Sequence, residues 1–196
     1  MNYFEVFGLP RRLGIDGAEL RRRFYELSRV HHPDFHQGDS PEEQARALDA
    51  SARLNAAYRA LRDPIARIEY LVRLEEGRET REGALVKPQA PPELLAEMFE
   101  IQEALAEAKT GALDHATRAT LRQQRDRLRE RQAGEEARLA GPLSQAWDAG
   151  EGGNRAAALR AFKESLATRA YLRTVVSDLD EALDGEPSAH AAHHRH

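Results

Sequence analysis

The stretch His-His-Pro-Asp-Phe at residues 31–35 lies between two helical patterns and decides how the N-terminal part of the chain folds. Proline lacks a backbone N–H and keeps the residue before it out of the helical conformation. We therefore expect the helix that begins near Ala18 to end at the two histidines. The next helix has its own start signals, because Ser40 can cap it, Pro41 suits its first position and Glu43 completes a capping box. A short, polar and restricted turn of this kind favours recognition over chemistry.

The helices on either side of this turn predict an antiparallel hairpin with the turn at its tip. The upstream helix places four residues on one face, and the downstream helix, residues 41–62, repeats apolar residues at helical spacing. These positions are Leu20, Phe24, Leu27 and His31 in the first helix and Ala47, Ala50, Leu54, Ala57, Tyr58 and Leu61 in the second. A short apolar helix at the N-terminus and another helix after Pro64 complete a predicted first domain at residues 1–75.

Two arginines lie on the other side of the upstream helix. Arg22 and Arg29 are roughly opposite its apolar face. A solvated charged face is the ordinary explanation for such residues. The alternative is an electrostatic docking surface for an acidic partner. The spacing by itself leaves both explanations open.

The second half of the chain predicts a separate helical domain at residues 92–185. Glycines, prolines and mixed charges interrupt the pattern at residues 76–91, which we interpret as a linker. The tail at residues 186–196 is rich in histidine and is predicted to be disordered. Metal binding by this tail and an origin in an expression vector are open alternatives.

Three helical stretches make up the predicted C-terminal domain. They cover residues 92–109, 114–150 and 154–183. Gly134, Gly141 and Pro142 are expected to weaken or kink the second stretch. Short connections between long helices favour an antiparallel three-helix bundle. With the N-terminal hairpin, this predicts an all-α fold.

The first helix of this domain carries two apolar stripes. The expected core face consists of Leu94, Met98, Ile101, Leu105 and Ala108. A second stripe with Leu95, Phe99 and Ala106 lies about 100–140° away. Glu100 and Glu103 lie just beyond it. A helix in a three-helix domain cannot easily bury both stripes, so the second one is either an exposed partner site with an acidic margin or a face that another part of the chain covers.

Composition excludes several classes of protein. Charged residues make up 32% of the 196 residues, aromatic residues 6%, and the net charge is −4. This balance, with no basic patch, argues against nucleic-acid binding. The chain has no cysteine, which excludes disulfides and thiolate metal sites. It has no apolar run of membrane-spanning length and no signal-peptide pattern. We therefore expect a soluble cytoplasmic protein.

Catalysis is not expected from the motifs of this sequence. No phosphate-binding glycine loop, nucleophile elbow or dinucleotide fingerprint occurs. The candidates for a metal or hydrolytic site are His31, His32, Asp34 and His36. All four lie on one short turn, whereas zinc sites usually take ligands from separate elements with a supporting outer shell. We expect neither a metal site nor an enzyme.

The combination of these features resembles a J-domain. A helical hairpin carries His-Pro-Asp at its tip, arginines on its first helix, and the sequence Ala-Tyr-Arg-Ala-Leu-Arg-Asp-Pro at residues 57–64. More specifically, the chain resembles the HscB family of iron–sulfur cluster co-chaperones. The resemblance lies in Tyr-Phe-Glu-Val-Phe-Gly-Leu-Pro at residues 3–10 and in Arg-Ile-Glu-Tyr-Leu at residues 67–71. It extends to about Leu183, with dense motifs over residues 3–74.

This resemblance implies a co-chaperone that works in two halves. The J-domain would stimulate ATP hydrolysis by a specialised DnaK-type chaperone, HscA. The C-terminal domain would bind the cluster scaffold IscU and deliver it to that chaperone. Members of this family do not hydrolyse ATP themselves, and no cofactor is implied. The alternatives are a general J-domain co-chaperone for unfolded clients and a passive helical adaptor.

The resemblance also implies two sets of site residues. The chaperone-binding set consists of His32, Pro33, Asp34, Arg22 and Arg29. The scaffold-binding set consists of Leu95, Ala96, Phe99, Glu100 and Glu103. Two positions depart from the family pattern, because Ala96 and Thr168 stand where the family can carry a larger apolar residue and an aromatic residue. The contribution of the last helix to scaffold binding is therefore open.

Overall fold

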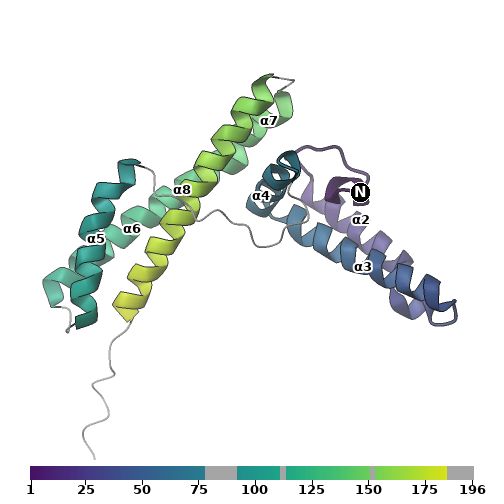
Figure 1. Cartoon of the computed structure of the whole chain (residues 1–196), viewed down its shortest axis with the longest axis horizontal. Helices are drawn as coiled ribbons and strands as arrows, with labels where there is room; N and C mark the ends of the chain where they lie inside the picture. The colour runs from purple at the N-terminus through teal and green to yellow at the C-terminus, as the bar shows by residue number, and fades with distance from the viewer. Residues whose placement is uncertain (78–91, 111–113, 151–152, 185–196) are drawn as a thin grey trace, which may run out of the picture. The chain divides into compact units, whose positions relative to one another are not determined.

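The computed structural model describes residues 1–77, 92–110, 114–150 and 153–184, and every regular element in these ranges is helical (Figure 1). The predicted all-α fold is therefore confirmed. None of the described helices combines the length and the hydropathy that a bilayer-spanning segment needs. The predicted linker falls almost entirely outside the described residues, and the histidine-rich tail falls wholly outside them.

The helices follow the chain in the order that the sequence pattern predicts. In the N-terminal part they are α1 (Tyr3–Val6), α2 (Gly17–Val30), the 3₁₀ turn η1 (Pro33–His36), α3 (Pro41–Arg62) and α4 (Pro64–Glu75). In the C-terminal part they are α5 (Pro92–Thr110), α6 (His115–Arg138), the π-helical turn η2 (Leu139–Leu143), α7 (Ser144–Ala149) and α8 (Gly153–Asp184).

The contacts divide the chain into two compact units, and neither unit is one continuous segment. The first unit combines residues 1–84 with residues 137–164. The second unit combines residues 85–136 with residues 165–196. Helix α8 contributes its first turns to the first unit and the remainder to the second.

Side-chain caps set the helix ends of the first unit. The carboxylate of Asp16 accepts the N–H of Ala18 at 2.8 Å and starts α2. Ser40 and Glu43 form the predicted capping box at the start of α3. Helix α4 ends before Gly77, whose φ of 66° is the left-handed conformation that glycine adopts without strain.

The hairpin of α2 and α3 packs around apolar residues that the pattern placed on facing sides. In Figure 1 its tip lies at the end opposite to the N-terminus. The rings of Phe24 and Tyr58 stack across the hairpin with their centroids 4.2 Å apart. The buried apolar residues of the N-terminal segment are Phe4, Phe7, Leu13, Leu20, Ala47, Leu54, Ala57, Leu61, Ile68, Tyr70, Leu71 and Val72.

A buried arginine fastens the loop between α1 and α2. The guanidinium of Arg67, on α4, donates to the carbonyl of Leu61 at 2.7 Å and to the carbonyl of Leu13. Burial lowers the pKa of Arg67, because the charged form is desolvated. The two carbonyl acceptors offset that cost and fix the course of the loop over α4.

A segment from late in the chain completes the first unit. The Asp148 carboxylate on α7 accepts the N–H of Leu13 at 2.8 Å with Oδ1 and the N–H of Gly14 at 2.7 Å with Oδ2. The Nζ of Lys163 lies 2.7 Å from Oε1 of Glu76. One carboxylate therefore holds two backbone donors that lie more than a hundred residues earlier in the sequence.

The second unit has its own apolar core between α5, α6 and the later part of α8. Its buried residues are Leu94, Ile101, Leu105, Leu121, Leu128, Leu172, Val175, Val176, Leu179 and Leu183. The predicted interruption of the middle helix is confirmed at Gly141 and Pro142, which lie in the π-helical turn. Gly134 is accommodated inside α6, which remains helical there.

Candidate functional site

The tip of the hairpin presents an exposed carboxylate on a short 3₁₀ turn. His32 caps this turn, and its Nδ1 accepts the N–H of Asp34 at 3.3 Å. Oδ2 of Asp34 lies 3.6 Å from the same nitrogen, and 73% of the Asp34 side chain is exposed. Pro33 opens the turn, and its side chain lies outside the described set. The structure therefore brings His32 and Asp34 together with the carboxylate directed to solvent.

His36 and Gln44 hold this turn in place from two sides. Nε2 of His36 lies 3.1 Å from the carbonyl of Val30 at the end of α2, and its Nδ1 lies 2.6 Å from Oδ2 of Asp39. On the α3 side, the Gln44 amide donates to the carbonyls of Gln37 at 3.2 Å and Asp39 at 3.0 Å. Neither role follows from the sequence pattern, in which His36 is a candidate metal ligand and Gln44 carries no signal.

The two contacts of the His36 ring favour its doubly protonated form. Both acceptors, the Asp39 carboxylate and the Val30 carbonyl, are satisfied together when each ring nitrogen carries a proton. The pKa of His36 is raised from its ordinary 6.5, chiefly by the hydrogen bond with Asp39 and then by that with Val30. The two contacts of the His36 ring thus tie the end of α2 to the residue before the cap of α3.

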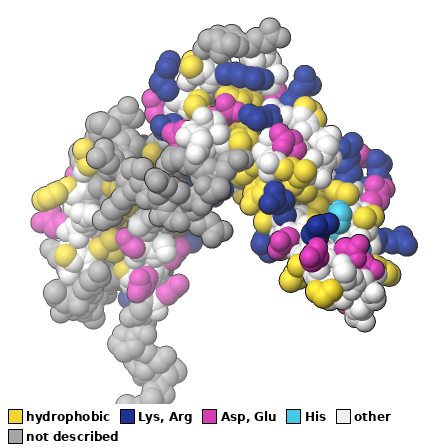
Figure 2. Space-filling model, turned by 45° about the vertical axis from the view of Figure 1, so that its right-hand side comes forward, with side chains coloured by type: hydrophobic (Ala, Val, Ile, Leu, Met, Phe, Trp, Pro, Cys, Tyr) yellow, Lys and Arg dark blue, Asp and Glu magenta, His cyan; other side chains and the backbone are white. Residues whose placement is uncertain are grey.

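The arginines of α2 differ in what they contact. Arg22 is exposed, and its guanidinium pairs with Glu19 and with Glu26, the latter at 3.7 Å. Arg29 is exposed and makes no ion pair among the described residues. Arg23 turns inward, where its Nη1 donates to the carbonyl of Phe7 at 2.6 Å. Figure 2 shows apolar, basic and acidic side chains interspersed on this part of the molecule, with a histidine among them.

The two stripes of α5 have opposite surroundings in the second unit. Leu94 is 2% exposed and belongs to the core, whereas the adjacent Leu95 is 55% exposed and Phe99 is 73% exposed. Glu100 and Glu103 are exposed beside them. The second stripe is therefore an apolar surface with an acidic margin. The side chain of Ala96 lies outside the described set, so its place in this surface stays a prediction.

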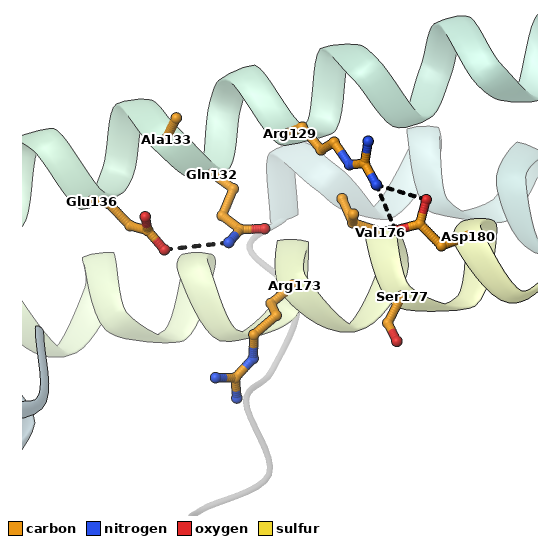
Figure 3. A pocket seen from close by; sticks show the side chains of 8 residues that line it. All are labelled: Arg129, Gln132, Ala133, Glu136, Arg173, Val176, Ser177 and Asp180. Carbon is orange, nitrogen blue, oxygen red and sulfur yellow. Dashed lines mark hydrogen bonds and ion pairs between the residues drawn. The ribbon is translucent and has the colours of Figure 1, made fainter.

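A groove lies between α6 and α8, and side chains that line it connect the two helices (Figure 3). The guanidinium of Arg129 donates to both carboxylate oxygens of Asp180, at 2.8 and 2.7 Å. Gln132 donates to Glu136 at 3.2 Å, and Figure 3 shows Arg173 extending away from α6. The Arg129–Asp180 pair joins α6 to α8, as does the Nε of Arg169, which donates to Glu136 at 2.7 Å, so these contacts have a structural role. No group of three or more potential metal ligands occurs within the described ranges.

Comparisons with known proteins agree with the geometry of the tip. The DnaJ domain family matches residues 2–70, which include the hairpin, the His-Pro-Asp turn and most of α4. The chain is also similar to the solved structure of the chaperone HscB from Vibrio cholerae. The two are 28% identical, the match covers 91% of this chain and 99% of the Vibrio chain, and the TM-score is 0.53.

A second solved structure extends the similarity beyond the J-domain as well. The human co-chaperone protein HscB is 25% identical, and the match covers 92% of this chain and 81% of the human chain with a TM-score of 0.61. Both matches include the C-terminal helices that the DnaJ domain family does not reach. A J-domain followed by these helices gives the chain the role of a co-chaperone for an Hsp70-type ATPase. Residues 2–70 of the chain match the DnaJ domain, and the chain is similar over 91–92% of its length to solved co-chaperone structures named HscB.

Proposed function

We propose that this chain is a co-chaperone of iron–sulfur cluster biogenesis that couples an HscA-type ATPase to an IscU-type scaffold. The observation that carries the proposal is the coexistence of two exposed sites on one chain. One is the Asp34 carboxylate at the tip of the hairpin. The other is the apolar surface of Leu95 and Phe99 on α5. A protein that joins two partners needs two such sites, and the HscB relatives carry the same two-part fold.

The chaperone side of the proposal is a coupling mechanism rather than catalysis by this chain. The J-domain changes the ATPase partner by binding its conformations with different affinity. Asp34 engages a basic group of the partner through a charge-assisted hydrogen bond, while His32 and Pro33 fix the turn. Arg22 and Arg29 add an electrostatic surface that speeds the encounter with an acidic patch. Arg29 has the larger share, because Arg22 is partly neutralised by Glu19 and Glu26.

The scaffold side rests on burial of apolar surface. Leu95 and Phe99 leave large side chains in water, which an interface with a partner would remove from solvent. Glu100 and Glu103 supply an acidic rim that favours a partner with basic residues around an apolar centre. We propose the same role for Ala96.

In this arrangement the domains are residues 1–75 and 92–185, joined by the linker at residues 76–91.

The test is single-turnover ATP hydrolysis by the cognate HscA-type chaperone. Hydrolysis is measured alone, with this protein, and with this protein plus its IscU-type scaffold. We expect acceleration by the co-chaperone and further acceleration when the scaffold is present. Stimulation that is indifferent to the scaffold would assign the chain to general client handling. No stimulation under any condition would reduce it to a helical adaptor.

The Asp34→Asn variant provides the sharpest control for the chaperone side. The substitution keeps the size of the side chain and removes the charge, so stimulation is expected to be lost. Helicity and thermal stability are expected to stay as in the wild type, because the Asp34 side chain is largely exposed. A stimulated rate equal to that of the wild type would disprove the role of Asp34.

A further inference from the structure

A groove lies beside the tip on the first helical turns of α3. Asp34 and Gln37 line it from the tip, and Pro41, Gln44, Ala45 and Leu48 line it from the helix. Positions 41, 44, 45 and 48 share one face of a helix. This face differs from the one that packs in the core, where the neighbouring Ala47 is buried.

The groove is apolar on its helical side and exposed to solvent. Leu48 is 59% exposed, which leaves a large aliphatic side chain in water next to the small Ala45 and the ring of Pro41. The helical wall is fixed before any partner arrives, because Gln44 is bonded to two carbonyls of the tip. A preformed apolar surface loses little conformational freedom when a side chain binds to it.

The charges around the groove select for a basic partner. Four carboxylates lie on the tip and the start of α3, and one of them, Glu42, is exposed on α3 outside the groove lining. Asp39 is engaged by His36 at 2.6 Å, and Glu43 is engaged by the hydroxyl of Ser40 at 2.7 Å. Asp34 is the charged member of the groove lining, and its carboxylate is not tied down by an arginine or lysine among the described residues. The groove therefore combines one available carboxylate with an apolar wall.

We propose that this groove receives an apolar side chain of the ATPase chaperone, next to the basic group that Asp34 binds. The inference rests on the proposed function, since it extends the same interface from the tip onto α3. The ATPase chaperone is the expected occupant because the groove is continuous with the His-Pro-Asp turn. Asp34 belongs to that turn and also lines the groove. A scaffold or client that filled this groove would compete with the chaperone for Asp34.

The proposal is tested by titrating the full-length protein against the chaperone in single-turnover ATP hydrolysis. Leu48→Ala is expected to raise the half-saturating concentration about tenfold, which is a modest loss for an apolar anchor. The maximal rate is expected to stay within about twofold, because Asp34 is unchanged. Ala45→Gln, which fills the groove with a polar side chain in a good helix former, is expected to have the same effect.

Two further observations separate a contact from a structural effect. The loss caused by Leu48→Ala is expected to be the same at low and high salt, since apolar contacts are not screened. Asp49→Ala is the matched control, because it truncates the adjacent exposed side chain outside the groove. This variant is expected to leave the half-saturating concentration within about twofold. The exposed position of Leu48 means that its truncation should not lower the melting temperature.

The outcomes distinguish this proposal from the proposed function. Unchanged half-saturation in both groove variants, with stimulation still lost in Asp34→Asn, would overturn the groove and leave the function standing. Absence of stimulation by the wild type would overturn both. If Leu48→Ala instead weakened scaffold binding or self-association and left the half-saturation unchanged, the groove would belong to that other partner and the proposal would be wrong.

Discussion

The imidazole of His36 connects the end of α2 with the residue that precedes the cap of α3. Its two hydrogen bonds need two donors, so the link is complete in the imidazolium form. The pKa of His36 is therefore higher in the folded protein than in the unfolded chain. A group with a raised folded pKa stabilises the fold fully below its unfolded pKa, and this contribution is lost as the pH rises through the folded value.

We predict that the tip is better ordered at pH 6 than at pH 8. A ¹H–¹⁵N titration of the His36 ring should give a midpoint above 6.5, and Asp39→Asn should lower it, since Asp39 is the largest cause of the shift. His36→Gln should reduce the difference in free energy of unfolding between the two pH values. A wild-type midpoint at or below 6.5 would show that the bond with Asp39 does not form in solution.

The role of His36 could not be read from the sequence for a physical reason. Its partners are the carbonyl of Val30, which every residue type carries, and Asp39, whose spacing of three does not by itself indicate contact in a loop. The turn at residues 32–34 does leave a mark in the sequence, because Pro33 restricts the backbone on either side of it. A restricted backbone leaves a signal in the sequence, whereas a hydrogen bond to a main-chain carbonyl leaves none.

At the scale of the element, two adjacent leucines of α5 are expected to have different roles, with Leu94 stabilising the core and Leu95 binding a partner. Leu94→Ala should lower the free energy of unfolding by about 2–5 kcal/mol, as expected for truncation of a buried leucine. Leu95→Ala should change it by less than about 0.5 kcal/mol, because that side chain is exposed. Chemical denaturation monitored by circular dichroism measures both. The second variant should instead weaken binding to the IscU-type scaffold by about 1–4 kcal/mol.

The same two measurements on these adjacent leucines could also contradict the prediction. A large loss of stability in Leu95→Ala, with scaffold affinity unchanged, would mean that the second stripe is covered by the protein itself. Isothermal titration calorimetry of both variants against the same scaffold completes the comparison. Because the two side chains are identical, any difference between them reports their surroundings.

Helical periodicity accounts for most of what the sequence predicted at this scale. It gave α3 as residues 41–62 and the end of α2 before the proline, since a cap, a proline and a repeated apolar face all agree there. It also separated the two stripes of α5. Periodicity could not decide whether the second stripe is covered, because a helix wheel contains no information about neighbouring helices.

At the scale of the whole molecule, Asp148 holds the loop before α2 from a position late in the chain. We predict that Asp148→Ala lowers the free energy of unfolding by about 1–3 kcal/mol, since the N–H groups of Leu13 and Gly14 lose a charged acceptor. Hydrogen exchange should show reduced protection of these two amides. Asp178→Ala, at an exposed position on α8, is the control and should change stability by less than about 0.5 kcal/mol.

Unchanged protection of both amides in Asp148→Ala would mean that α7 does not hold this loop.

The predicted domain boundaries follow the order of the chain, whereas the contact units interleave its two halves. The bond from Asp148 joins a side chain to main-chain donors, which carry no mark in the sequence. An interleaved unit of this kind is therefore invisible to any search for linkers and composition shifts, and the boundaries at residues 75 and 92 stay a prediction.

The divided first unit has a consequence for how the protein is made. Chains emerge from the ribosome N-terminus first, at about 5–20 residues per second, and domains generally begin to fold as they appear. The hairpin of α2 and α3 emerges early, but the residues that complete its unit, 137–164, follow only after α5 and α6. For several seconds the nascent J-domain therefore exists without the Asp148 carboxylate that accepts the N–H groups of Leu13 and Gly14. We therefore expect the newly made hairpin to reach its full stability only when synthesis of the chain is nearly finished.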